Sequence, residues 1–300
     1  MKIIIAGASG FVGKRLTSHL SKTHSIQTVG RGDGSHITWD PQVETENKEL
    51  NEAISKADVV INLCGAGIAD KKWTDEYKKI LTESRVSTNN LLAKSIKAAK
   101  NQPKLFISAS GTPYKHNSGG SSEDSELADG FLANLVRKWE ESAMQVQSKN
   151  TRVVCVRTGV VLDESGGFLK KISLPFKLGL GGKIGSGNQV IPWISLEDLV
   201  NIYAFIIEND VEGCINAAAP TMTLNEKFTK SYGRHVNRPT ILPTPVFALK
   251  LIYGEELVWE LMLKNNHVVP KKLLELGYIF HHNSIDKFFK KDKTAYSNNK

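Results

Sequence analysis

The sequence contains few cysteines and no long apolar run. Its three cysteines, Cys64, Cys155 and Cys214, each lie inside an apolar stretch, far from one another. An odd number without paired spacing argues against a disulfide framework and against a zinc site, so we expect no metal and a reducing compartment. No stretch approaches the ~18 apolar residues that span a membrane, and the first residues do not resemble a cleavable signal. We therefore expect a cytoplasmic protein without a membrane partner.

Arginine-rich helices with interleaved aromatic residues are also missing. The formal net charge is +8, but residues 286–300 hold five lysines against two aspartates, which is typical of a basic, flexible tail. The remaining excess is modest, so nucleic acid is not an expected partner and small anionic molecules are favoured. The sequence leaves open whether the chain forms a homodimer.

A glycine turn near the N-terminus is the strongest local pattern. Ile3, Ile4 and Ile5 predict a strand buried on both faces. Three glycines follow at intervals of three, and apolar residues then recur at helical spacing: Gly7, Gly10 and Gly13, then Phe11, Leu16 and Leu20. In this context the glycines permit a tight turn, contact with a pyrophosphate and close packing of the helix on the strand. The alternative is a plain strand-to-helix turn.

Arg31 follows the second predicted strand, residues 26–29, where NAD-selective folds usually carry an acidic residue. Its guanidinium suits a ribose 2′-phosphate, so the sequence predicts NADP(H) in preference to NAD(H). Asp33 nearby argues the other way, and a solvated surface arginine is the alternative. Asp40 is placed to accept from an adenine amino group. The predicted cofactor-binding residues are Gly7, Ser9, Gly10, Phe11, Val12, Gly13, Arg31, Asp40, Leu63, Cys64, Gly65 and Ser108.

Strands and helices alternate along the first half of the chain. We expect short strands at 37–39, 58–64, 104–108 and 151–157, and helices at 47–56, 73–82, 84–100 and from Asp129, as a cap, to 148. The segment 110–128 has the composition of a long loop, of the kind that is functional or disordered. After residue 160 we expect a loop-rich stretch, a late strand at 215–219 and helices at 247–264 and 271–275. The pattern predicts an α/β fold with a doubly wound parallel sheet.

The chain resembles the extended short-chain dehydrogenases/reductases, and more closely an atypical, epimerase-like group described as NAD-dependent epimerases/dehydratases. The matching motifs are Gly7-x-x-Gly10-x-x-Gly13, Asp58–Asn62, Asn62–Gly65, Trp73-Thr74, Ser84-Arg85, Ser108–Ser110, Trp139-Glu140, Arg157–Gly159, Gly181-Gly182, Gly185–Gly187, Trp193-Ile194, Pro270–Leu273 and Leu276–Tyr278. The resemblance implies a Rossmann-type core at 1–160 with 190–220 returning to it. It implies a smaller, mostly helical substrate lobe at 161–189 and 221–285.

The catalytic pattern of that family is incomplete here. Its members use a Tyr-x-x-x-Lys pair with a Glu four residues further on, and aligning this Glu with Glu140 puts Leu132 and Val136 in the places of the pair. The family's helix asparagine falls on Arg85, and only the serine, Ser110, remains. The acid–base group and the cation that lowers its pKa are both missing.

Tyr114, four residues after Ser110, is the nearest replacement for the phenol, with packing as the alternative. The candidate catalytic residues are therefore Ser110, Tyr114 and Arg85. Cations suited to an anionic substrate are Arg85, Lys115, His116 and Lys183, each with a surface role as the alternative. Two functions follow: an NADP(H)-dependent oxidoreductase or epimerase acting on a small polar or anionic substrate, or a regulator or redox sensor that binds NADP(H) without turnover.

Overall fold

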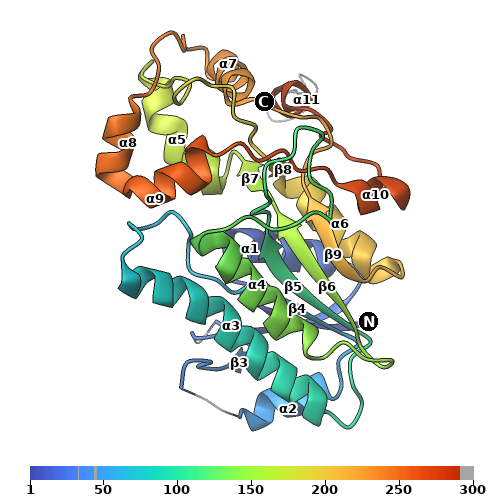
Figure 1. Cartoon of the computed structure of the whole chain (residues 1–300). Helices are drawn as coiled ribbons and strands as arrows, with labels where there is room; N and C mark the ends of the chain where they lie inside the picture. Colours follow the sequence, from blue (N-terminus) through green and yellow to red (C-terminus); the bar gives the residue numbers. More distant parts are fainter. Residues whose placement is uncertain (33, 44–45, 291–300) are drawn as a thin grey trace, which may run out of the picture.

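A seven-stranded parallel sheet forms the centre of the molecule (Figure 1). The computed structural model describes residues 1–32, 34–43 and 46–290. Strand order across the sheet is β3-β2-β1-β4-β5-β6-β9, with every neighbouring pair parallel. The strands are β1 (Lys2–Ala6), β2 (Ser25–Gly30), β3 (Ile37–Thr38), β4 (Val59–Asn62), β5 (Leu105–Gly111), β6 (Arg152–Thr158) and β9 (Gly213–Ala217). The predicted doubly wound α/β fold is confirmed.

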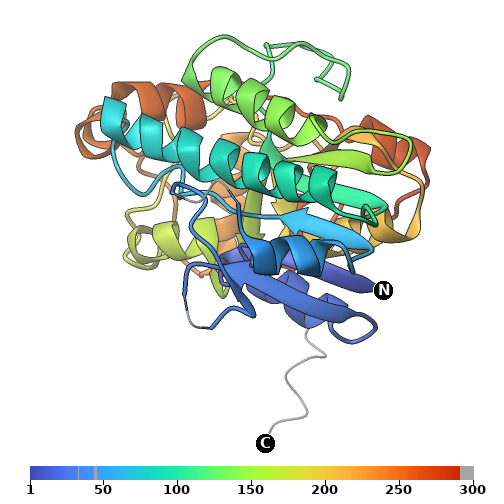
Figure 2. The same ribbon diagram turned by 90° about the horizontal axis from the view of Figure 1, so that it is seen from below.

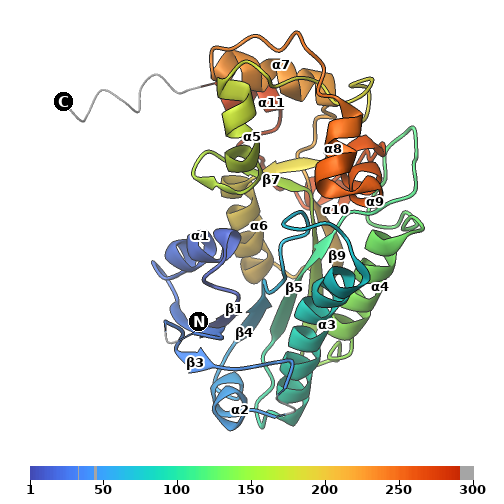
Figure 3. The same ribbon diagram turned by 90° about the vertical axis from the view of Figure 1, so that its left-hand side faces the viewer.

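Helices cover both faces of this sheet, as Figures 2 and 3 show. Ile3 and Ile5 of β1 pack against α1 (Phe11–Leu20) and α6 (Leu196–Glu208). Ile4 faces the opposite layer, made of α2 (Lys48–Ile54), α3 (Asp75–Ala98) and α4 (Phe131–Met144). Because successive side chains of a strand point to opposite faces, a continuous isoleucine run serves both layers.

Two helix boundaries differ from the sequence prediction. The helices expected at 73–82 and 84–100 are one helix, α3, whose start is capped by the Thr74 hydroxyl, which accepts from Tyr77 N–H. Helix α4 begins after Gly130, which has φ +105°, and Gly130 rather than Asp129 precedes its first residue. The expected cap by Asp129 was therefore wrong, because the left-handed backbone of a glycine makes the turn instead.

The predicted loop after β5 is a loop in the structure, but its backbone is firmly attached. Tyr114 and Leu127 form an antiparallel bridge across it, and Ser121 pairs with Val268 near the C-terminal end of the chain. Ser121 N–H donates to the His267 carbonyl at 2.7 Å. The segment is therefore ordered by contacts that are distant in sequence.

A smaller lobe follows β6, with a two-stranded parallel sheet of β7 (Val160–Asp163) and β8 (Trp193–Ser195). Its helical elements are α5 (Gly167–Lys177), α7 (Asn225–His235), α8 (Val246–Tyr253), α9 (Glu255–Val258), the π-helix η1 (Trp259–Leu263) and α11 (Ile285–Phe289). Helix α10 (Lys271–Glu275) returns to the main sheet, where Leu273 packs in the same core cluster as β1 and α6. Helix α5 lies within the stretch expected to be loop-rich. Apolar residues Leu169 and Phe176 bury one side of it, despite Pro175 inside the helix.

Buried Asp198 fastens the C-terminal segment to the start of α6. Its carboxylate accepts from the backbone N–H groups of His281 at 2.7 Å and His282 at 2.9 Å, and from the Ser195 hydroxyl at 2.8 Å. Burial works against the charged form, but these hydrogen bonds prevail and hold the pKa of Asp198 below its ordinary value. The backbone at His281 and His282 is thereby held against the start of α6.

Candidate functional site

The glycine turn between β1 and α1 has no room for side chains. Gly7 has φ +81°, and a Cβ there would lie 2.8 Å from the Leu63 carbonyl carbon at the end of β4. A Cβ on Gly13 would lie 2.2 Å from the Gly7 carbonyl oxygen. Gly10 precedes α1 in extended conformation and is exposed. The turn is compact because each of two glycines touches backbone, which is the geometry predicted for a pyrophosphate-binding turn.

The start of α1 offers unsatisfied donors. No side chain caps the helix, and its first turn contains no acidic residue. A helix start with free N–H groups carries a partial positive charge, which favours a phosphate. Ser9 is exposed beside Gly10, and Phe11 and Val12 are half-buried at the same end. These residues, with Gly7 and Gly13, fit the diphosphate of a dinucleotide.

Arg31 lies at the carboxyl end of β2 and is exposed. Its positive charge acts on the thiol of Cys64, a residue that follows the carboxyl end of β4. Burial raises the pKa of the Cys64 thiol to about 12, and Arg31 opposes part of that rise. Asp40 follows Trp39 in the sequence and is half-buried; its carboxylate accepts a hydrogen bond from the Gln42 N–H at 3.1 Å. Asp33 lies outside the described residues.

The loop after β4 forms the opposite side of the turn. Asn62 Oδ1 accepts from Cys64 N–H, and its amide donates to Thr88 and Asn89 of α3. Asn89 in turn donates to the Ser108 hydroxyl at 3.1 Å. Ser108 is fully buried, so in this conformation its hydroxyl joins β5 to α3; its predicted contact with the cofactor stays a prediction.

Arg85 lies under this loop and is almost fully buried. Its guanidinium donates to the carbonyls of Leu81 and Ala66, each at 2.9 Å, and lies over the Trp139 ring. Gly65 lies close beside it: a Cβ there would be 3.0 Å from the guanidinium carbon, so the Arg85 side chain would have to shift slightly to admit it. Burial lowers the pKa of Arg85 to about 10. Arg85 thus shapes the Gly65-Ala66 backbone.

Ser110 belongs to a buried polar network between β5, α4 and β6. Its hydroxyl donates to Glu140 Oε1 at 2.6 Å. Arg157 binds the same carboxylate with two parallel hydrogen bonds, from Nε at 2.7 Å and from Nη2 at 2.8 Å. Burial disfavours the Arg157 cation, but the hydrogen bonds and charge of Glu140 outweigh it and raise the pKa of Arg157. We name this set, with Tyr114 and Asn216, the Glu140–Arg157 network.

Tyr114 is the far end of that network. Its hydroxyl donates to Asn216 Oδ1 at 2.6 Å and accepts from Arg157 Nη1 at 2.8 Å. Burial raises the pKa of Tyr114 to about 12, although the charge of Arg157 opposes the rise. The structure therefore joins Ser110 and Tyr114 through Glu140 and Arg157, and leaves Arg85 outside the network. Their predicted catalytic roles stay predictions.

The remaining predicted positions are also placed. Leu132 is half-buried among apolar residues near Trp73, and Val136 is buried with its side chain close to Gly111. Lys115 pairs with exposed Glu126 at 2.6 Å, and His116 contacts the Asn265 amide. The Leu132 and Val136 side chains are thus both apolar and at least half-buried.

Sequence reasoning missed the contact of the lobe with the glycine turn. The Phe11 ring lies against Gly166 and Gly167, where an added Cβ would come within 2.8 and 2.7 Å of it. On α5, Lys171 donates to Asp70 at 2.6 Å and to the Ala69 carbonyl at 3.2 Å. The paired glycines Gly166-Gly167 and the aromatic residue within the glycine turn, Phe11, are the signals that could have indicated this contact.

Comparisons with known proteins agree with this geometry. The model of the NAD dependent epimerase/dehydratase family matches residues 3–218, and that of a domain of unknown function, DUF1731, matches residues 244–291. The chain belongs to the NAD dependent epimerase/dehydratase family. It therefore has an NAD(P)-binding, Rossmann-like fold, as its resemblance implied.

Relatives of this family match over nearly the full chain. The mouse epimerase family protein SDR39U1 is 36% identical over 288 residues, covering 93% of this chain and 94% of the mouse protein. The epimerase family protein Mb2239 of Mycobacterium bovis is 35% identical, covering 94% of each. The crystal structure of human SDR39U1 with NADPH matches with a TM-score of 0.88 and 33% identity, covering 97% of this chain and 98% of that chain.

Sugar-nucleotide epimerases share the fold at lower identity. The crystal structure of the Thermus thermophilus UDP-glucose 4-epimerase complex with NAD matches with a TM-score of 0.73 and 15% identity, over 96% of this chain and 97% of that chain. At this identity the likeness concerns the fold alone.

Proposed function

We propose that this protein is an NADP(H)-binding, epimerase- or oxidoreductase-like protein that acts on a small polar or anionic substrate. Arg31 carries the cofactor proposal: it stands exposed at the end of β2, where a 2′-phosphate needs a cation. The uncapped start of α1 supports the diphosphate part, and human SDR39U1, 33% identical, was crystallised with NADPH.

The cofactor supplies hydride exchange when bound. The protein binds and selects the cofactor: the turn from Gly7 to Gly13 holds the diphosphate, and Arg31 selects the phosphorylated ribose. We further propose that residues 161–189 and 221–285 form the substrate side above the 1–160 core. Three free cysteines support a reducing cytoplasm as its location.

A regulator or redox sensor is the second candidate, and one observation favours it. Leu132 and Val136 supply no proton donor and no cation, while Ser110 and Tyr114 are engaged in a buried network. Catalysis by either hydroxyl requires this network to open toward a substrate.

The cofactor proposal is tested by calorimetric titration of wild type and Arg31→Asp with NADPH and NADH. A charged hydrogen bond contributes about 1.5–3 kcal/mol, so we expect wild type to prefer NADPH by roughly ten- to hundredfold and the variant to lose that preference. Lys22→Asp, at an exposed position beyond the C-terminal end of α1, is the charge-matched control. Equal affinities in wild type would remove Arg31 from the proposal.

A substrate screen distinguishes the two candidate functions. Carbonyl compounds and sugar nucleotides are offered with NADPH, and oxidation of the cofactor is followed by absorbance. Turnover of any of them supports the enzyme. Tight NADPH binding without turnover across the screen supports the sensor.

A further inference from the structure

The lobe ends in a surface of exposed apolar side chains, which we name the lobe tip. Leu178 and Leu180 follow α5 and are 64% and 62% exposed; Ile241 and Leu242, between α7 and α8, are 86% and 63% exposed. The two segments touch: Arg238 Nε donates to the Lys177 carbonyl at 2.7 Å, and Gly182 lies against the Leu242 carbonyl. Figures 1 and 3 place both segments at the end of the molecule opposite α2.

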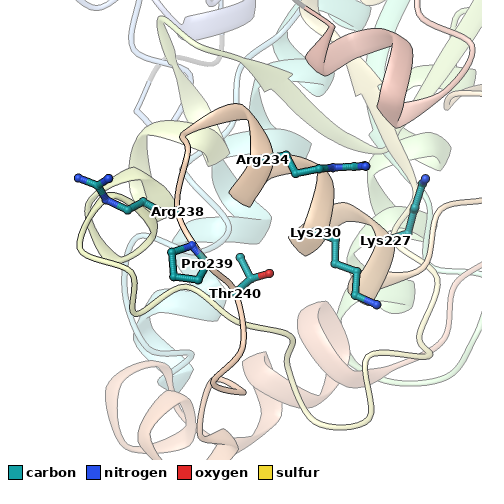
Figure 4. A pocket seen from close by; sticks show the side chains of 6 residues that line it. All are labelled: Lys227, Lys230, Arg234, Arg238, Pro239 and Thr240. Carbon is teal, nitrogen blue, oxygen red and sulfur yellow. The ribbon is translucent and has the colours of Figure 1, made fainter.

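A basic hollow of about 380 Å³ adjoins the tip (Figure 4). Helix α7 contributes three cations to it, and the chain that leads to Ile241 closes the other side. The lining residues are Lys227, Lys230, Arg234, Arg238, Pro239 and Thr240. Lys227 and Arg234 share Asp286, and Lys230 pairs with Glu226. Arg238 has no carboxylate partner among residues 1–32, 34–43 and 46–290, so the hollow keeps a net positive charge.

The two segments that build this end of the lobe contain no acidic residue. Residues 165–196 carry four lysines, and residues 227–254 carry five lysines and arginines, with neither Asp nor Glu in either range. Glu226 and Asp286 neutralise part of the charge, but positive charge remains in excess. Apolar side chains that project from such a surface are a poor match for a second copy of this chain, because like charges would face each other. They match an anionic surface that accepts apolar groups.

We propose that the lobe tip docks on an anionic lipid bilayer. Leu178, Leu180, Ile241 and Leu242 enter the interface between headgroups and acyl chains, and the basic hollow holds a lipid phosphate. In the described part of the chain no helix is long and apolar enough to cross a membrane. Docking on a surface needs no such helix, so the proposal replaces our expectation that the protein has no membrane partner.

The test is sedimentation of the full chain with vesicles of phosphatidylcholine alone or mixed with phosphatidylglycerol. We expect binding to the mixed vesicles only, and weaker binding as salt is raised, because exposed charges are screened. Lys177→Gln with Lys230→Gln should lower partitioning about fivefold for each cation removed. Ile241→Asn with Leu242→Asn should abolish it by removing the inserted groups.

Matched controls come from other surfaces of the same chain. Lys56 and Lys104 line a second hollow that contains Asp58, so Lys56→Gln with Lys104→Gln makes the same charge change elsewhere. Ile279→Asn replaces an apolar residue that is 84% exposed outside the tip. Both should bind as wild type does, and a melting curve with NADPH shows that every variant is folded.

Three results would overturn the proposal. The first is no sedimentation with phosphatidylglycerol vesicles, and the second is an equal loss in the tip variants and their controls. The third is a concentration-dependent dimer in analytical ultracentrifugation that Ile241→Asn with Leu242→Asn dissociates, since that would assign the tip to a second copy of the chain.

Discussion

Two regions at the carboxyl edge of one sheet are built in opposite ways. The glycine turn after β1 is exposed at Ser9 and Gly10, lacks side-chain caps and leaves the donors at the start of α1 unsatisfied. The Glu140–Arg157 network after β5 and β6 is buried, and its carboxylate, guanidinium and phenol are all hydrogen-bonded to protein. Backbone N–H groups without a protein partner can bind a ligand, whereas buried polar groups that are already hydrogen-bonded stabilise the fold.

The residues of the two regions are also constrained in different ways. The turn keeps all three glycines, because replacing Gly7 or Gly13 would force a side chain into backbone. In the second region the Ser110 hydroxyl donates to Glu140.

The largest expected effect is loss of stability in Glu140→Gln. The amide removes the negative charge that pairs with Arg157 and leaves a buried, uncompensated cation. Breaking a buried pair in this way costs about 3–5 kcal/mol, which urea unfolding at pH 7 measures. NADPH binding by the folded variant should change little, because within the described part of the chain no hydrogen bond joins the network to residues 7–13.

The control is Glu126→Gln, which breaks the exposed pair with Lys115. An exposed pair contributes about 0–1 kcal/mol, so this variant should unfold near wild type. If both variants lose the same stability, the buried network does not stabilise the fold as its geometry indicates.

Gly10→Glu tests the other side of the comparison. The new carboxylate would occupy the place of the diphosphate at a helix start that favours anions. We expect a folded protein that no longer binds NADPH, and so lacks the stabilisation of about 2.7 kcal/mol that a ligand gives at a hundred times its dissociation constant. Thermal unfolding with and without NADPH measures the difference.

Gly119→Glu adds the same charge in a loop, where a Cβ meets only Asn117 at 3.6 Å. It should keep the full thermal shift with NADPH. A folded Gly10→Glu protein whose shift matches that of Gly119→Glu would contradict the assignment of the turn.

The sequence could predict the glycine turn because all its requirements lie within thirteen residues. The strand, the glycines and the helical spacing of Leu16 and Leu20 are local signals, and the parallel sheet follows from their repetition. The contact of Gly166 with Phe11 could not be predicted in this way, because it joins segments more than 150 residues apart.

The same holds for the Glu140–Arg157 network. Tyr114 and Asn216 are 102 residues apart, and the buried partners of Arg157 come from three segments. From sequence Tyr114 was a candidate proton donor because it follows Ser110 closely; its burial depends on residues that no local pattern connects to it. Helix α5 was missed because Pro175 and the surrounding glycines conceal an apolar face.

The smallest expected effect is that of Tyr114→Phe, and it decides which region performs chemistry. Removing the hydroxyl leaves Asn216 Oδ1 without its donor and takes one acceptor from Arg157, whose Nη1 keeps the Glu123 carbonyl. A buried polar group that loses its partner costs about 1–2 kcal/mol, which urea unfolding detects. Since burial raises the pKa of Tyr114 to about 12, the phenol is a weaker proton donor than an ordinary tyrosine. We therefore expect Tyr114→Phe to be less stable than wild type and to retain NADPH affinity and any NADPH-dependent turnover found in the substrate screen.

Phe280 is buried elsewhere, and Phe280→Leu supplies a control with a comparable loss of stability. If turnover is lost in Tyr114→Phe and kept in Phe280→Leu, the phenol is the proton donor, and the network is part of the active site rather than its support.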